Sequence, residues 1–272
     1  MWKYLDKDKL KEFILSLNLI TGNMSDKEIL NSLYAISNNN KKYYTKKYIN
    51  KRDGTKRELL VPKIFLKNIQ RNILNHVLYG LSVSKYATSY LPNISIKDNA
   101  IPHVNQKVIL KLDIKDFFKN ITFEQLYSSL PDEVLPKQVK VLLIKLCTYD
   151  DYLPQGAPTS PMLSNLAMKR FDEYIGEYCK NKNIMYTRYC DDLTFSGNFN
   201  PYQLKNKVEA FLNTLGFNLN EEKTQIIRSG NRQMVTGVVV NKKLNAPRSY
   251  RKKLRQELYY INKYGLDNHL EK

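Results

Sequence analysis

Short apolar segments of two kinds alternate along the 272-residue chain, some with helical spacing and others with the alternation of strands. Residues 25–37 begin with Ser25 and Glu28 at the spacing of a capping box and continue with apolar residues at helical intervals, which predicts a helix. Residues 41–62 predict a β-hairpin, because an aromatic strand and a second strand flank a turn at Asp53–Gly54.

Pro62 predicts the end of that hairpin and the start of a helix. Proline lacks an amide hydrogen, so it weakens a strand but suits the first turn of a helix. We expect the second strand to end before Pro62 and a helix to follow over residues 63–80. The apolar stripe of this helix is predicted to be Phe65, Ile69, Ile73 and Val77.

The remaining pattern mixes strands, hairpins and helices. Residues 107–118 predict a buried strand that runs into a turn, and residues 186–197 predict a second hairpin. The other expected helices are 136–147, 160–179, 201–215 and 248–264, with short strands within 216–228 and 233–240. Because hairpins replace regular strand–helix–strand repeats, we expect an α+β fold with an antiparallel sheet rather than a doubly wound sheet.

The charge balance is strongly positive, with 44 Lys and Arg residues against 26 Asp and Glu residues, a formal net charge of +18. Such a field favours a polyanionic partner, although lysines that serve solubility alone are the simpler alternative. No run of about 18 apolar residues indicates a membrane span. The opening residues, MWKYLDKDKL, are too charged for a signal peptide, and we expect no membrane partner.

The three cysteines, Cys147, Cys179 and Cys190, are widely spaced and odd in number. They form no Cys-x-x-Cys pair, so neither a disulfide framework nor a zinc site is expected. A reduced, cytoplasmic setting fits this cysteine usage best. The three histidines are equally dispersed and give no basis for histidine-based catalysis.

Three aspartates stand out because they end or interrupt apolar strands. Asp113 ends one predicted strand, and Asp191 and Asp192 are adjacent inside the second hairpin. A carboxylate at such a position is unusual unless it is paired or holds a cation. If the two strands are neighbours, the carboxylates converge, and Mg²⁺ suits them because it takes oxygen ligands and bridges to phosphates. Two such ions about 3.5–4 Å apart support phosphoryl or nucleotidyl transfer; a merely solvated Asp-Asp turn is the alternative.

Residues 153–166, LPQGAPTSPMLSNL, put Gln155 and Gly156 among prolines just ahead of an expected helix. Glycine lets the backbone approach a ligand closely, and glutamine can hydrogen-bond to that ligand. A proline-rich turn that caps the helix is an equally adequate interpretation of this segment taken alone.

In sequence order, four stretches resemble the palm motifs of reverse transcriptases: LDIKDFF, LPQGAPTSP, YCDD and LNEEKT. NAIPH at 99–103 and VTG at 235–237 are similar to two elements that mark bacterial retron reverse transcriptases. The resemblance runs from about residue 25 to about residue 265, and the motifs are specific as a set.

This resemblance implies a right-hand polymerase fold with fingers, palm and a short helical thumb. Residues 1–105 would form N-terminal helices and fingers, with further fingers elements around 131–160. Residues 106–230 would form the palm, and residues 231–272 the V-T-G region and the basic thumb. The palm motifs would lie at 107–118, 153–166, 186–197 and 219–224.

The same resemblance implies a catalytic site. Asp113, Asp191 and Asp192 would hold two Mg²⁺ ions, with the backbone carbonyl of Ile114 as a further ligand. The nucleophile would be a primer hydroxyl that attacks the α-phosphate of an incoming deoxynucleotide. Lys223 in the EEKT stretch would protonate the departing pyrophosphate, although a plain surface lysine is the alternative.

Further residues match nucleotide-binding positions of the family. Phe118 would crowd the sugar 2′ carbon and exclude ribonucleotides by bulk, unless it only packs in the core. Arg57, with Lys56 as a weaker candidate, would grip the triphosphate, whereas a solvated charge on an edge strand is the plain alternative. Gln155 and Gly156 would line the nucleotide pocket.

RNA and primer contacts are implied along several segments. Tyr189 would pack under the primer end, or else be a core tyrosine. Basic and aromatic residues interleave over 241–265, which suits phosphate contact and base stacking; a solvated basic helix is the alternative. The other implied RNA- or primer-binding residues are Asn99, His103, Val235, Thr236, Gly237, Arg248, Arg251, Lys252, Lys253 and Arg255.

Two features depart from the family pattern. Cys190 stands where retron enzymes usually carry alanine, an exchange of small residues that should be tolerated. The chain ends at Lys272 after one basic helix, as a naturally short member or a shortened chain would, and without a ribonuclease H segment. Removal of RNA from the hybrid would then need another enzyme.

The resemblance favours an RNA-directed DNA polymerase of retron type. It would bind its own structured non-coding RNA and a template-primer, prime from an internal 2′-hydroxyl, and make a branched RNA–DNA molecule for phage defence, with an effector protein as a further partner. A group II intron or diversity-generating reverse transcriptase is the second interpretation. A non-catalytic RNA-binding scaffold that holds a toxin partner is the third, and the three intact carboxylates argue against it.

Overall fold

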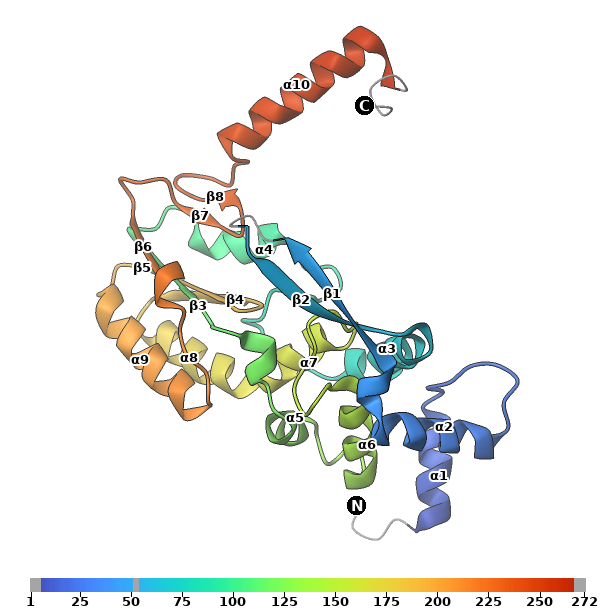
Figure 1. The fold of residues 1–272 in the computed structure, drawn as a ribbon. Coiled ribbons are helices and arrows are strands. Elements are labelled where there is room, and N and C mark those ends of the chain that lie inside the picture. Colours follow the sequence, from blue (N-terminus) through green and yellow to red (C-terminus); the bar gives the residue numbers. More distant parts are fainter. Residues whose placement is uncertain (1–5, 51–53, 267–272) are drawn as a thin grey trace.

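Helices and antiparallel strands are mixed along the chain, as the α+β prediction requires; the computed structural model describes residues 6–50 and 54–266 (Figure 1). The α-helices are α1 (Lys7–Ser16), α2 (Asp26–Asn38), α3 (Ile64–His76), α4 (Ile96–Ala100), α5 (Phe123–Ser129), α6 (Lys137–Cys147), α7 (Ser160–Ala167), α8 (Lys169–Asn181), α9 (Pro201–Thr214) and α10 (Arg248–Tyr264). The strands are β1 (Tyr44–Asn50), β2 (Lys56–Pro62), β3 (Val108–Asp113), β4 (Met185–Tyr189), β5 (Asp192–Gly197), β6 (Gln225–Arg228), β7 (Met234–Val235) and β8 (Val238–Val239). Short 3₁₀ turns are η1 (Asn40–Tyr43), η2 (Leu78–Gly80), η3 (Ile101–His103), η4 (Phe117–Asn120) and η5 (Glu221–Lys223).

The local signals near the N-terminus are confirmed. Ser25 Oγ accepts a hydrogen bond from the backbone N–H of Glu28, whose side chain accepts one from the N–H of Ser25, so the capping box begins α2. The hairpin predicted over 41–62 is formed by β1 and β2, which pair antiparallel. Asp53 of its predicted turn lies outside the described residues.

The predicted boundary at Pro62 is wrong by one residue on each side, for the end of the strand and for the start of the helix. Pro62 is the last residue of β2, opposite Tyr44, and α3 begins at Ile64 with Lys63 as its N-cap. A proline at the end of a strand interrupts no further ladder bond, so the pairing can extend to it.

The predicted apolar stripe of α3 is also wrong at its first position. Phe65 is 41% exposed, whereas Leu66 is fully buried together with Ile69 and Ile73. Helix α3 packs on α6, and this contact selects the side of the helix that is buried. Both Phe65 and Leu66 are apolar, so their order in the sequence does not decide which one points inward.

The helix predicted over 160–179 is divided at Met168 into α7 and α8. The N–H of Met168 still bonds to the Ser164 carbonyl, but its backbone has φ −85° and ψ −1°, outside regular helix geometry. The bend lets α7 pack on α5 while α8 packs on β4.

The central sheet has the strand order β4–β5–β3–β6, with antiparallel neighbours throughout. Successive side chains of a strand point to opposite faces, so β4 contacts two layers. Tyr186 and Arg188 bond to Asp172 of α8, while Thr187 bonds to His103 of η3. The sheet therefore lies between the α8–α9 layer and the α4–η3 segment (Figure 1).

One apolar core extends from α1 to Leu219, just beyond α9, and a second, small cluster ties the β7–β8 hairpin to the sheet. That cluster consists of Ala100, Ile109, Val235 and Val240. Helix α10 has no buried residue and projects away from the body in Figure 1. None of the helices in the described ranges is long and apolar enough to cross a membrane.

Candidate functional site

The register of two strands brings the predicted carboxylates together. Asp113 ends β3 and lies directly opposite Asp192, the first residue of β5. Asp191 precedes Asp192 in the β4–β5 turn, and its carbonyl accepts a 3.0 Å hydrogen bond from the backbone N–H of Ile114. Three aspartates from two separate segments therefore share one end of the sheet.

The turn before Asp191 has an unfavourable backbone conformation that buried groups hold in place. Cys190 has φ +61°, in the left-handed region, which costs about 1 kcal/mol or more for a residue with a Cβ. Its N–H donates to Ser89 Oγ at 2.8 Å, and its carbonyl accepts from Arg188 Nη1 at 3.0 Å. Side chains thus fix both backbone groups of Cys190, directly before Asp191.

Arg188 is the centre of a buried polar network that sequence reasoning missed. Its guanidinium donates to both carboxylate oxygens of Asp172 and to Asn165 Oδ1. Tyr186 donates to the same carboxylate, and Asn165 Nδ2 donates to the Ser89 carbonyl. The sequence signals that could have indicated the network are a charged residue inside the strand MYTRY and an aspartate in α8 that follows Phe171 and precedes Ile175 by three residues.

Burial and mutual repulsion disfavour the charged forms of the two adjacent aspartates. Desolvation raises the pKa of Asp191, and the nearby charge of Asp113 also raises it. Desolvation raises the pKa of Asp192 to about 6, with Asp191 as the main repelling charge. A cation bound here would relieve both effects, since opposite charge favours ionised carboxylates.

Lys223 supplies one positive charge to this site. Its Nζ lies 3.1 Å and 3.0 Å from the two carboxylate oxygens of Asp113. Burial alone would lower the pKa of Lys223, but the hydrogen bond and the charge of Asp113 outweigh it and raise the pKa. The ammonium group therefore stands at a cation position beside the carboxylate.

Within the described parts of the chain, no group of three or more His, Cys, Asp or Glu side chains is gathered closely enough to hold a metal ion. In this arrangement Asp113 is paired with Lys223 instead. The donor chemistry nevertheless fits a hard divalent cation, because the oxygen-bearing residues Asp113, Ile114 and Asp191 line one cavity.

That cavity has a volume of about 430 Å³ and reaches from the end of the sheet to the β1–β2 hairpin. The predicted residues that line it are Lys56, Arg57, Asp113, Ile114, Phe118, Gln155, Asp191 and Lys223. Lys115 and Lys119 line it as well and were not singled out from the sequence. The cavity combines carboxylates with basic side chains, a charge pattern that suits a cation and a polyphosphate together.

The loop before α7 touches β2 at Gly156. The N–H of Leu60 donates to the Gln155 carbonyl at 2.8 Å. Gly156 has φ +124°, and a Cβ there would come within 3.0 Å of the Leu60 carbonyl oxygen, so the position needs glycine. Gly156 lines a neighbouring cavity of about 300 Å³, which shares Phe118 and Gln155 with the larger one.

Two predicted residues, Tyr189 and Asp192, do not line the 430 Å³ cavity. They face each other across the β4–β5 turn. The ring of Tyr189 is half-buried, with its centroid 6.4 Å from that of Tyr90. Tyr189 is thus neither a fully buried core residue nor a free surface ring.

The predicted RNA contact of His103 is wrong, because its side chain is fully buried and cannot touch RNA. Its ring nitrogens lie 2.7 Å from Ser196 Oγ and 2.8 Å from Thr187 Oγ1. Burial lowers the pKa of His103 to about 3, so the ring is neutral at ordinary pH. His103 fastens η3 to the β4–β5 hairpin that carries Asp191.

Asn99 and Val235 are fully buried too, which corrects their predicted RNA contact. Asn99 Nδ2 donates to Thr236 Oγ1 at 3.2 Å, and Val235 belongs to the small apolar cluster. Thr236 and Gly237, in the β7–β8 turn, keep exposed surface. The NAIPH and VTG elements therefore bind each other.

Helix α10 presents basic and aromatic side chains to solvent. The predicted residues Arg248, Arg251, Lys252, Lys253 and Arg255 are all exposed on it. The rings of Tyr260 and Tyr264 stack with their centroids 6.1 Å apart. Cations and rings are thus available together, as single-stranded nucleic acid would require.

Known proteins match most of this chain. Residues 49–251 match the family described as Reverse transcriptase (RNA-dependent DNA polymerase). The chain is 35% identical over 240 residues to Retron Mx65 reverse transcriptase of Myxococcus xanthus, covering 80% of this chain and 56% of that protein. It is 32% identical to Retron Ec86 reverse transcriptase of Escherichia coli, covering 75% of this chain and 65% of the relative. It is 31% identical to Retron Ec83 reverse transcriptase of Escherichia coli, covering 75% and 70%.

The chain therefore spans 56% and 65% of the length of the first two relatives. Among solved structures, telomerase from Candida albicans in complex with a fragment of telomeric RNA matches with a TM-score of 0.58 at 11% identity, covering 81% of this chain and 50% of that one. Apo telomerase from Candida tropicalis, truncated from its C-terminal domain, matches with a TM-score of 0.53 at 12% identity, covering 84% and 63%. These likenesses confirm the predicted polymerase fold.

Proposed function

The chain belongs to the reverse transcriptase family, and to the retron reverse transcriptases within it, so we propose that it is an RNA-directed DNA polymerase. It extends a primer hydroxyl with deoxynucleoside triphosphates on an RNA template. The observation that carries this proposal is the register of Asp113 opposite Asp192, with Asp191 beside them, next to a cavity that also contains Arg57 and Gln155.

The aspartates and the carbonyl of Ile114 hold two Mg²⁺ ions in this proposal, in line with the general metal dependence of the family. When bound, such ions lower the pKa of the attacking hydroxyl and stabilise the leaving pyrophosphate. The primer hydroxyl loses its proton to solvent, and its oxygen forms a bond to the α-phosphorus while the bond to the pyrophosphate oxygen breaks. Lys223, whose ammonium group is already beside Asp113, donates a proton to the pyrophosphate.

The incoming nucleotide is held by the other residues of the cavity. Arg57, with Lys56 beside it, binds the triphosphate oxygens, because a guanidinium can chelate phosphate with two hydrogen bonds. Phe118 excludes a ribose 2′-hydroxyl by bulk. Gln155 and Gly156 form the pocket wall, which is supported by the close approach of this loop to β2.

The RNA partner is a cognate structured non-coding RNA, held by α10, by Thr236 and Gly237, and by Tyr189 at the primer end. The net charge of +18 and the exposed cations of α10 support this contact. Fingers, palm and thumb would divide the chain at about residues 105 and 230. We also propose priming from an RNA 2′-hydroxyl, a branched RNA–DNA product used in phage defence with an effector protein, and a cytoplasmic location, which three free cysteines support.

A primer-extension assay with Mg²⁺ tests the activity. The Asp191→Asn variant should lose DNA synthesis while RNA binding survives, because only the carboxylate charge is removed. Asp151→Asn, an exposed aspartate of the loop after α6, is the matched control and should keep full activity. DNA synthesis by Asp191→Asn at the normal rate would contradict the proposal. If the chain were a scaffold without activity, neither the unchanged chain nor the Asp151→Asn control would synthesise DNA.

Sequencing the nucleic acid that co-purifies with the chain tests the retron assignment. A single structured RNA joined to DNA through a 2′-linkage is expected. Intron RNA, or complementary DNA of a variable repeat, would instead assign the chain to the group II intron or diversity-generating enzymes.

A further inference from the structure

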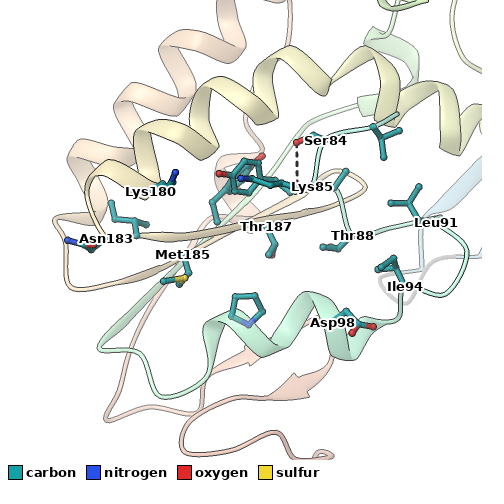
Figure 2. A pocket seen from close by; sticks show the side chains of 16 residues that line it. Ser84, Lys85, Thr88, Leu91, Ile94, Asp98, Lys180, Asn183, Met185 and Thr187 are labelled. Atoms are coloured by element: carbon teal, nitrogen blue, oxygen red, sulfur yellow. Dashed lines mark hydrogen bonds between the residues drawn. The ribbon is translucent and has the colours of Figure 1, made fainter. Parts of the chain in front are cut away.

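A groove of about 780 Å³ lies beside β4 and shares no lining residue with the carboxylate cavity (Figure 2). Its walls are the segment 83–94, the α4–η3 segment and the first residues of β4. In Figure 2, Lys180 and Asn183 lie at one end of the groove, and Leu91, Ile94 and Asp98 lie at the other. The groove therefore runs beside β4, whose residues Met185 and Thr187 lie between its two ends.

The groove has apolar side chains along its length. Leu91 and Ile94 come from one wall, Pro102 from η3, and Met185 from β4. Ile94 and Met185 are each 43% exposed. Contiguous apolar surface of this kind is typical of a contact site, since single exposed apolar residues are scattered on most proteins.

Unused main-chain groups lie along the same groove. Strand β4 is at the edge of the sheet. At Arg188 this edge is already paired: its N–H donates to the Tyr86 carbonyl at 2.7 Å, and its carbonyl accepts from the Thr88 N–H at 2.8 Å. Outward-pointing backbone groups recur every two residues, so the N–H and carbonyl of Tyr186 point to the same side.

The chain that pairs with Arg188 does not continue along β4 to Tyr186. The N–H of Ala87 bonds to the Ser84 carbonyl, so the segment turns away from the strand at that point. Among the residues that the structure describes, none bonds to the N–H or carbonyl of Tyr186 from this side. A further strand could pair there, since an open edge of a sheet is a template for main-chain pairing.

The charges beside the groove favour one kind of partner. Lys85 Nζ lies 5.1 Å from the ring centroid of Tyr86, and Lys180 Nζ lies 4.0 Å from Glu177, at the limit of an ion pair. The carboxylate of Asp98 accepts hydrogen bonds from the backbone N–H and the hydroxyl of Ser95 in a capping box, so it already has partners at the start of α4. Lys180 thus favours an acidic side chain at its end of the groove, and Lys85, which also lines the groove, favours a second one.

We propose that this groove binds an extended segment of a partner protein, which pairs with the open edge of β4 at Tyr186 and carries alternate apolar residues and an acidic end. Such strand addition takes its affinity from main-chain hydrogen bonds and its specificity from pockets for alternate side chains. The site is separate from the proposed polymerase activity. Nucleic acid fits less well, because the groove is mostly apolar and has few cations for phosphates.

Selection from a library tests this proposal. Random peptides of about twelve residues, displayed on phage, are selected on the full chain, and the Ile94→Asp variant serves for counter-selection. The enriched peptides should alternate apolar and polar residues and carry Asp or Glu at one end. A fluorescein-labelled synthetic copy of the best peptide is then titrated by fluorescence anisotropy.

The synthetic peptide should bind Ile94→Asp roughly tenfold more weakly than the unchanged chain, and the double variant Lys85→Glu, Lys180→Glu should weaken binding by a similar factor. Ile96→Asp, an equally exposed change outside the groove, should bind normally. Hydrogen exchange at the Tyr186 amide should slow when the peptide is bound. Primer extension should be unchanged in all variants, which shows that they are folded.

The proposal is overturned if no peptide is enriched against Ile94→Asp, or if the enriched peptides bind both proteins equally. The proposal is also overturned if an oligothymidylate probe binds Ile94→Asp more weakly than the unchanged chain while the peptide binds both equally. That result would assign the groove to nucleic acid. Peptide binding without protection of the Tyr186 amide would exclude strand addition.

Discussion

Arg188 and Asp172 form an ion pair in which both side chains are fully buried, with Arg188 Nη2 2.6 Å from the Asp172 carboxylate. The same guanidinium bonds to the Cys190 carbonyl, one residue before Asp191. The charge pair between β4 and α8 thereby holds the turn that carries the candidate site. Removing one partner leaves the other charge buried without water or a counter-ion, which is a strongly unfavourable state.

Asp172→Asn should therefore lower the free energy of unfolding by about 3–5 kcal/mol. Urea denaturation followed by circular dichroism measures the change. Glu177→Gln, an exposed change on the same helix, is the control and should stay within about 0.5 kcal/mol. A loss as small as that of the control would mean that the buried pair contributes little to stability.

Ser89→Ala should lower kcat roughly tenfold while KM for the deoxynucleotide stays unchanged, because an unpaired buried N–H at Cys190 costs about 1–3 kcal/mol and lets the turn move. Ser89 is a positioning residue, so Ser89→Thr, which keeps the hydroxyl, should restore most of the rate. Ser84→Ala, an equally buried serine outside this turn, is the control. An unchanged kcat in Ser89→Ala would mean that the hydrogen bond from Cys190 to Ser89 does not affect catalysis.

Lys223→Ala should lower kcat by about 10²-fold or more if the ammonium group protonates the departing pyrophosphate. Single-turnover extension separates this step from nucleotide binding. Lys207→Ala, on α9, removes the same charge away from the site and is the control. A loss below about threefold would favour the interpretation of Lys223 as a surface lysine that only pairs with Asp113.

Phe118→Ala should raise ribonucleotide incorporation relative to deoxynucleotide incorporation, by roughly tenfold, because the ring excludes the 2′-hydroxyl by bulk alone. The ratio of the two kcat/KM values is the measurement. Phe123→Ala, in α5, removes a ring that does not line the cavity and should leave the ratio unchanged. An unchanged ratio in Phe118→Ala would favour simple packing against Phe117.

Acidification should destabilise the fold through His103. Burial lowers its pKa from the ordinary 6.5 to about 3, so the unfolded chain binds a proton between these values and the folded chain does not. The stability is thus full above pH 6.5 and falls as the pH decreases from 6.5 towards 3, by at most about 1.4 kcal/mol per pH unit for one proton.

The comparison of the unchanged chain with His103→Gln isolates this contribution, since carboxylates also titrate in that range. Between pH 6 and 4, the free energy of unfolding of His103→Gln should depend less steeply on pH than that of the unchanged chain. The difference in slope should correspond to about one proton. Parallel pH curves for the two proteins would contradict the assignment of a neutral, buried imidazole.

Local features of this protein were predictable because neighbouring residues determine them. The capping box at Ser25, the two hairpins and the strand that ends at Asp113 depend on spacing over a few residues, and the structure has them all. The convergence of Asp113 with Asp191 was also predictable, once the two strands were taken as neighbours. The roles of these residues in catalysis stay predictions.

Tertiary packing decided what spacing could not. The sequence alone determined the α+β class, the basic charge and the order of the motifs. Whether Phe65 or Leu66 turns inward, and whether Asn99 and His103 face RNA or the interior, depended on the partners supplied by distant segments. Arg188 found its counter-ion on another element in the same way. Burial is a property of all the packed layers together, so a polar residue shows its hydrogen-bond partner only when the layers are assembled.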